Sequence, residues 1–190
     1  MTQWPPPDDL PFVDTLWTTQ EARAISAHHE AMGIRWYGWA VTSDEAERAR
    51  AAPWPVIRVA DERYDSPGWA CAGFDKAWRS MQCLFADPRR EGVFQPRPAF
   101  SLVEGDVTWV NEGEYEPHVG ILSARQVRAI SDDLATVSHV DVRAYCRHWF
   151  PNAIDEPTPE EQYVTHYLEE AKEFAADSAS RGHCAIYIIR

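Results

Sequence analysis

The sequence predicts an α+β fold, a single domain in which helices pack on a small mixed or antiparallel sheet. Three segments lead to this prediction. Residues 34–41, IRWYGWAV, are rich in the β-branched and aromatic side chains that favour strands. Residues 158–180 open with the clearest helix start in the chain, a threonine followed by proline and two glutamates. Residues 184–189, CAIYII, form an apolar run that predicts a buried strand.

We expect the segment 68–85 to form a central helix of the core. Its large apolar residues recur at the spacing of one helix face: Phe74, Trp78, Met81 and Phe85. A Ser-Pro pair precedes the segment and an Asp-Pro pair follows it, which are start and stop signals for a helix. Each large apolar side chain that such a helix buries stabilises the fold by roughly 1.5–3 kcal/mol.

Capping and turn signals place the remaining elements. The proline-rich residues 1–12 predict an extended arm ahead of a single domain at 13–190. Capping patterns predict helix starts at four further positions: Thr18, Thr42, Ser123 and Ser138. Runs of β-forming residues predict strands or extended segments at 56–59, 100–103, 107–110 and 119–122. The acidic run 112–116 is expected to be a turn between two of these.

Charge limits the classes of partner. The chain of 190 residues carries 18 basic and 30 acidic side chains, a formal net charge of −12. Residues 101–190 hold 7 of the basic and 16 of the acidic groups, so most of the excess lies in the second half. An acidic protein is repelled by nucleic-acid phosphates and by anionic membranes. We therefore expect no nucleic acid and no membrane as partner, and a basic protein as the favoured one.

Cysteine and histidine spacing predicts neither a metal site nor a cofactor site. The four cysteines have no paired spacing, and Cys146 and His148 stand two apart on an expected helix, so their side chains diverge. Glycine-rich phosphate loops are also missing from the sequence. Because no apolar leader or membrane-length run is seen, we expect a cytoplasmic protein with reduced thiols.

Acid–base chemistry has three weak candidates: Asp75, Glu112 and His118. A carboxyl group with a raised pKa beside an imidazole could serve as a general base. The alternative is that the acids near His118 form a solvated loop, as charge runs usually do. Asp75 could likewise form an i,i+4 ion pair with Arg79 on the expected central helix. The same acidic run offers candidate partner-binding residues: Glu112, Glu114 and Glu116.

Three stretches resemble the YfbM-like family, a domain family of unknown function. The first is Asp75-Lys76-Ala77-Trp78 with the apolar positions that follow it, Met81, Leu84 and Phe85. The others are residues 121–127 and the closing run 163–189. The resemblance covers about residues 68–190 and implies an α+β fold without a known activity. This chain has Arg79 and Gln82 where family members tend to carry histidine, so no role is transferred to those positions.

Two functional hypotheses follow. The first is an acidic protein-binding module, of the kind that neutralises a toxin or regulates a basic partner, since charge complementarity speeds and directs association. The second is a small-molecule enzyme or ligand-binding domain, because nine tryptophans could line an apolar pocket with acid–base groups at its edge. Without a recognisable catalytic motif, the sequence leaves open whether the protein is an enzyme.

Overall fold

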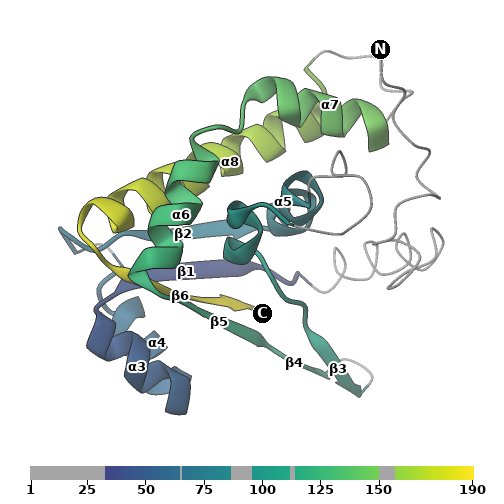
Figure 1. Ribbon diagram of the computed structural model, residues 1–190. Coiled ribbons are helices and arrows are strands. Elements are labelled where there is room, and N and C mark those ends of the chain that lie inside the picture. Colours follow the sequence, from purple (N-terminus) through teal and green to yellow (C-terminus); the bar gives the residue numbers. More distant parts are fainter. Residues whose placement is uncertain (1–32, 65, 87–95, 112–113, 150–156) are drawn as a thin grey trace.

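The computed structural model describes residues 33–64, 66–86, 96–111, 114–149 and 157–190. The elements in chain order are β1 (Trp36–Val41), α3 (Ser43–Ala51), α4 (Pro53–Asp61), β2 (Cys71–Asp75), α5 (Ala77–Phe85), the 3-10 helix η2 (Pro98–Leu102), β3 (Thr108–Asn111), β4 (Glu114–Glu116), β5 (His118–Leu122), α6 (Ala124–Leu134), α7 (His139–Trp149), α8 (Pro159–Ser180) and β6 (Cys184–Ile189) (Figure 1). The α+β prediction is confirmed.

A four-stranded antiparallel sheet in the order β2-β1-β6-β5 organises the fold. Of the two sheet types left open by the sequence, the antiparallel one is therefore correct. β6 pairs with β1 on one side and with β5 on the other, and all six of its residues are buried. The strand predicted at residues 184–189 is thus confirmed and lies inside the sheet. β3 and β4 form a separate hairpin that leads into β5.

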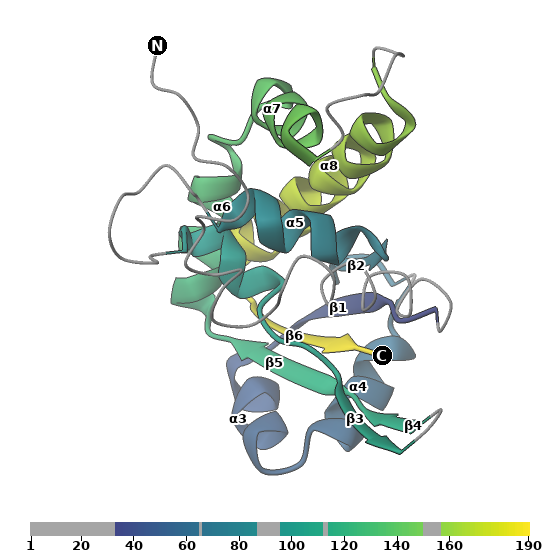
Figure 2. The same cartoon turned by 90° about the vertical axis from the view of Figure 1, so that its right-hand side faces the viewer.

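Helices cover both faces of this sheet (Figure 2). α5, α6 and α8 lie on one face, whereas α3 and α4 lie on the other. The larger core fills the first side, with β2 and β6 contributing side chains toward α8. The smaller core fills the second side, where α4 packs on β1 and α3 on β6, and Val56 and Ile57 share one apolar cluster with Ile186. The sheet is therefore the middle of three layers.

A row of rings crosses the larger core from strand to strand. Trp36 stacks on Phe74 with the ring centroids 3.9 Å apart, and on Tyr187 at 5.6 Å. Two glycines make room for it: a Cβ at Gly38 would collide with the ring of Trp36, and one at Gly120 with that of Tyr187. The indole of Trp36 donates a hydrogen bond to Leu102 O at 2.9 Å, so its polar atom is satisfied although the side chain is fully buried.

Three of the predicted caps form as expected. Thr42 and Ser123 each build a complete capping box, with Glu45 and Gln126 as the respective third helical residues. Thr158 accepts a hydrogen bond from Glu161 N at 3.0 Å and begins α8, which runs for 22 residues. These starts are set by neighbouring residues along the chain, which is why the sequence alone predicts them.

The single helix predicted at 68–85 is wrong in its first half. Residues 71–75 form β2, and the helix begins only at Ala77. The burial of 71–75 alternates, with Ala72 and Phe74 buried, as in a strand. Asp75 then takes a left-handed conformation, φ 44°, which ends the strand and turns the chain into α5. The predicted buried positions Phe74, Trp78, Met81 and Phe85 are nevertheless all in the core.

Two further predictions of extended structure are corrected. Residues 56–59 belong to the helix α4, because Pro53 and Pro55 stand in its first turn, where proline is tolerated and pre-set for helical φ. Residues 100–103 lie in and just after η2, which begins at Pro98. β3, β5 and β1 match the strands predicted at 107–110, 119–122 and 34–41. The arm at 1–12, the domain start at 13 and the helix predicted from Thr18 lie outside the described residues.

Candidate functional site

β2 is an edge strand, and its outer side faces a groove. Its inner side pairs with β1, and just before it Ala40 N donates to Ala70 O at 2.8 Å. Hydrogen-bonded and non-hydrogen-bonded pairs alternate along an antiparallel ladder. The pair of Gly73 with Tyr37 is therefore a non-hydrogen-bonded one, and the N–H and C=O of Gly73 point away from β1. No strand in the described part of the chain pairs with this outer side.

The helix α8 forms the opposite wall of that groove. Residues 70–73 and Tyr64 line one side, and Tyr167 and Phe174 contribute the rings on the other. The cavity between them measures about 510 Å³ and is open to solvent. Its lining on α8 is completed by three carboxylates at helical spacing, Glu170, Glu173 and Asp177. We call this cavity the β2–α8 groove.

The three carboxylates leave the β2–α8 groove with a negative charge. The carboxylate of Glu170 lies 3.1 Å from Nε2 of His166. The histidine neutralises the charge of Glu170 only when its imidazole is protonated. Asp177 pairs with Arg181 at 2.9 Å, but both side chains remain about two-fifths exposed or more. Glu173 is exposed and has no cation partner among the described residues. Such partly exposed charges attract a cationic ligand with little desolvation penalty.

Asp75 lies at the other end of β2, where three elements meet. Its carboxylate accepts hydrogen bonds from Arg35 Nε at 2.7 Å and from Tyr163 Oη at 2.8 Å. The hydroxyl of Tyr163 in turn accepts one from Lys76 N at 3.2 Å. Burial alone would raise the pKa of Asp75, but these hydrogen bonds outweigh it and hold the pKa below its ordinary value. Burial and the adjacent carboxylate raise the pKa of Tyr163.

The predicted ion pair of Asp75 with Arg79 is therefore wrong. Asp75 belongs to β2 and binds Arg35, whereas Arg79 on α5 binds Asp106 through Nη2 at 2.7 Å. Tyr163 also contacts Tyr167 edge-on at 5.0 Å, and Tyr167 lines the β2–α8 groove. The catalytic candidate Asp75 is thus an ionised acceptor near the groove, at a strained backbone position.

His118 lies in a different part of the molecule, on β5. It is half-buried, and its ring lies so close to Gly105 that a side chain there would collide with it. Burial lowers the pKa of His118, opposed by the charges of Glu104 and Asp106. This favours a neutral imidazole. Neither the β2–α8 groove nor the second cavity described below is lined by His118.

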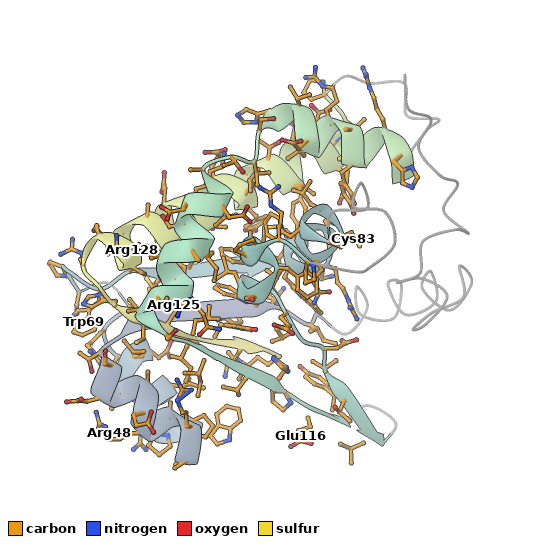
Figure 3. The ribbon with its side chains drawn as sticks, in the orientation of Figure 1. Arg48, Trp69, Cys83, Glu116, Arg125 and Arg128 are labelled. Atoms are coloured by element: carbon orange, nitrogen blue, oxygen red, sulfur yellow. The ribbon has the colours of Figure 1, made fainter. Side chains whose placement is uncertain are left out.

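The acids predicted beside His118 are not brought together with it in a described site. Glu116 is exposed on the β3–β4 hairpin, away from α8 (Figure 3). Glu112 lies outside the described residues, as does the side chain of Glu114. The groups on α8 that line a cavity, Glu170 and Glu173, were not singled out by the sequence. Their only signal was the acidic excess of residues 101–190.

Arg79 and Gln82, the departures from the family pattern, brace the loop before β3. Gln82 is buried, and its Nε2 donates to Val103 O at 2.6 Å and to Gly105 O at 2.7 Å. Arg79 Nη1 donates to the Oε1 of the same amide at 3.1 Å. With all of these polar atoms satisfied inside the protein, the pair has a structural part in this chain.

The described residues hold no group of three or more histidine, cysteine, aspartate or glutamate side chains that could bind a metal ion. None of the four cysteines, all of which lie in the described ranges, is part of a disulfide. Within the same residues, no helix is both long and apolar enough to cross a membrane.

Comparison with known proteins shows which family this chain belongs to. Residues 32–188 match the family model of a domain of unknown function, DUF1877. The chain belongs to this family. Its extent shows that the family likeness reaches further toward the start of the chain than residue 68, and it includes β1 and the helices α3 and α4. No curated protein matches the chain.

A solved structure agrees with the family assignment. The protein of unknown function YfbM from Escherichia coli superposes with a TM-score of 0.51, at 14% sequence identity. The match covers 82% of this chain and 99% of that one. At this identity the likeness shows the fold alone, whereas membership of the DUF1877 family rests on the match over residues 32–188.

Proposed function

We propose that this DUF1877 domain is a protein-binding module that takes an extended, basic segment of a partner into the β2–α8 groove. One observation carries the proposal: a strand edge that pairs with no other described strand faces three carboxylates across a groove of about 510 Å³. The open edge offers main-chain hydrogen bonds, and the carboxylates offer charge selection.

The dimensions of the two walls fit such a segment. A strand added beside β2 would exchange hydrogen bonds with the N–H and C=O of Gly73. Side chains on one face of a strand recur every two residues, about 7 Å apart. Along α8, Glu173 and Asp177 are separated by four residues, or about 6 Å of helix axis. Two lysine or arginine side chains, two residues apart, could therefore each reach one carboxylate.

The partner class is a basic protein, such as a toxin neutralised by an immunity protein or the target of a regulator. The net charge of −12 supports this class and disfavours nucleic acid and anionic membranes. The four cysteines are not joined in disulfides, which supports a reducing compartment, so a cytoplasmic location is part of the proposal.

A labelled peptide of about eight residues that alternates lysine and valine tests the charge part of the proposal. Its fluorescence anisotropy should report binding at about 50 mM salt, and the affinity should fall severalfold at about 300 mM. Glu173→Lys should weaken binding about tenfold, because it replaces attraction by repulsion. Glu47→Lys is the matched control, since Glu47 is 79% exposed on α3, on the other face of the sheet.

The same assay separates the groove from the hairpin. If the hairpin acids bind the partner, as the sequence first indicated, Glu116→Lys would weaken the binding of the peptide more than Glu173→Lys does. Equal losses in Glu47→Lys and Glu173→Lys would mean that only the net charge matters, and the proposal would be withdrawn.

Backbone pairing has its own test. N-methylation of every second peptide residue removes the N–H groups along one edge of the added strand. Methylation of the edge that faces β2 should abolish binding, and methylation of the opposite edge should leave it unchanged. In the complex, the amide of Gly73 should exchange with solvent more slowly. Equal effects of the two methylated peptides would exclude strand addition.

A small-molecule enzyme or ligand-binding domain is the second candidate. The observation that favours it is Asp75, an ionised carboxylate in a left-handed conformation between Arg35 and Tyr163. A thermal-shift screen of small cationic metabolites would test it. A ligand that stabilises the wild type but not Asp75→Asn would support this function over peptide binding.

A further inference from the structure

A second groove lies between α3 and α4, which cover the face of the sheet opposite to α8 (Figure 2). Its volume is about 450 Å³. The apolar part of its lining consists of Ala51, Ala52, Pro55, Val56 and Val59, and its polar part of Glu45, Arg48 and Arg58. We call it the α3–α4 groove.

The α3–α4 groove is positively charged although the chain as a whole is acidic. Glu45 lines it, but both carboxylate oxygens are already bound: Oε1 to Arg63 Nη2 at 2.5 Å and Oε2 to Thr42 N at 2.9 Å. Within the part of the chain that the structure describes, Arg48 makes only a long hydrogen bond in its own helix, to Asp44 O at 3.4 Å. Arg58 is exposed and has no partner among the described residues. Two guanidinium groups are thus available for an anion.

Apolar surface is exposed on the same helix. Val59, which lines the groove, is 44% exposed, and Trp54 in the first turn of α4 is 50% exposed. The other two large apolar side chains of α4, Val56 and Ile57, are buried. Exposed apolar side chains flanked by cations are typical of a surface that binds another protein.

We propose that the α3–α4 groove binds an acidic amphipathic helix of a partner protein. An apolar side chain of that helix packs between α3 and α4 on Val59, and its carboxylates pair with Arg48 and Arg58. Charge complementarity selects this occupant, because the lining combines two arginines with five apolar or small residues, and a small anion alone would leave those residues uncovered. A helix laid in an apolar groove is a common mode of peptide recognition.

The consequence is a domain with two binding surfaces of opposite preference. The β2–α8 groove selects cations, and the α3–α4 groove selects anions on the other side of the sheet. The domain can then hold two different partners at once. This second surface does not depend on the first, because they share no residue.

The probe for this surface is a labelled helical peptide of about 14 residues, with leucine at helix-face spacing and glutamate elsewhere. Arg58→Glu and Arg48→Glu should each weaken its binding at least about tenfold, since attraction becomes repulsion. Val59→Asp should do the same. Arg50→Glu is the matched control, because Arg50 lies on α3, is exposed, pairs with Glu47 and is not in the groove lining.

Circular dichroism and the unfolding midpoint of each variant exclude misfolding as the cause, and these exposed positions should leave both unchanged. Glu173→Lys should not weaken the binding of this probe, so the result for the α3–α4 groove can be told apart from the result for the β2–α8 groove. The inference is overturned if Arg50→Glu weakens binding of the probe as much as Arg58→Glu does. It is also overturned if the bound probe slows hydrogen exchange at amides of α8 and not at those of α3 and α4, or if the probe fails to bind at millimolar concentration.

Discussion

Replacing Gly38 by alanine should destabilise the protein through a collision with one ring. The ideal Cβ position lies 2.8 Å from Trp36 Cζ3 and 2.9 Å from Cζ2, and it is closer still to Cη2. Contacts this short are essentially never seen for a real Cβ. Trp36 cannot move aside freely, because it is fully buried between Phe74 and Tyr187 and its indole is held by Leu102 O.

The expected loss of stability is the difference between two opposing effects on the free energy of unfolding. Overpacking a well-filled core costs about 1–3 kcal/mol. The loss of glycine's freedom in the unfolded chain favours the folded state by about 0.4–1 kcal/mol. Gly38→Ala should therefore lower the free energy of unfolding by roughly 1–2 kcal/mol. For a chain of this length each kcal/mol corresponds to a fall in Tm of about 2–4 °C.

Urea denaturation followed by tryptophan fluorescence measures the change. Gly73→Ala on the neighbouring strand is the control, because its added Cβ would meet Tyr37 at 3.5 Å, an ordinary contact. This variant should be unchanged or stabilised by up to about 1 kcal/mol. Trp36→Phe, which lacks the colliding atoms, should show a coupling of at least about 0.5 kcal/mol with Gly38→Ala. Equal midpoints for the two glycine variants would refute the steric argument.

Three other outcomes are expected. Thr158→Ala removes the cap of α8 and should lower the free energy of unfolding by about 1 kcal/mol, measured by urea denaturation. Because the pKa of Asp75 is depressed in the folded state, its contribution to stability is present above the unfolded pKa of about 3.9 and is lost as the pH falls through the folded value. Tyr163→Phe should raise the pKa of Asp75, so the variant should lose more stability relative to wild type at pH 7 than at pH 3. A loss that is the same at both pH values would contradict this prediction. Burial raises the pKa of Cys146 to about 12, so iodoacetamide should alkylate Cys71 in the native protein and Cys146 only after unfolding.

Local chemistry explains which elements the sequence predicts well. Thr42, Ser123 and Thr158 begin helices through contacts with residues three positions on, and those contacts are visible in the sequence. The apolar pattern around Phe74 fits both a helix and a strand that continues into a helix. The chain leaves the strand at Asp75, whose left-handed conformation and whose carboxylate contacts with Arg35 and Tyr163, from distant parts of the chain, cannot be seen in that local pattern.

The grooves could not be predicted for a related reason. The β2–α8 groove joins residues 70–73 to a helix about a hundred positions later, and it exists only because β2 is placed at the edge of the sheet. The acidic excess of the second half indicated a cationic partner. It could not show that Glu173 lines a groove whereas Glu116 lies exposed on a hairpin. In α4, β-branched residues favoured a strand, and the prolines of its first turn together with packing on β1 made it a helix.

The position of β6 also constrains how the chain reaches its native state. Trp36 and Ile189 are neighbours in the sheet although they are about 150 positions apart in sequence, and such pairings slow folding. Because β6 lies between β1 and β5, the β1–β2 pair can form before residues 184–189 are available, whereas β5 has no partner strand in the described sheet until β6 arrives. One edge of β1 and the whole of β5 therefore stay uncovered until late in folding, when exposed strand edges favour aggregation.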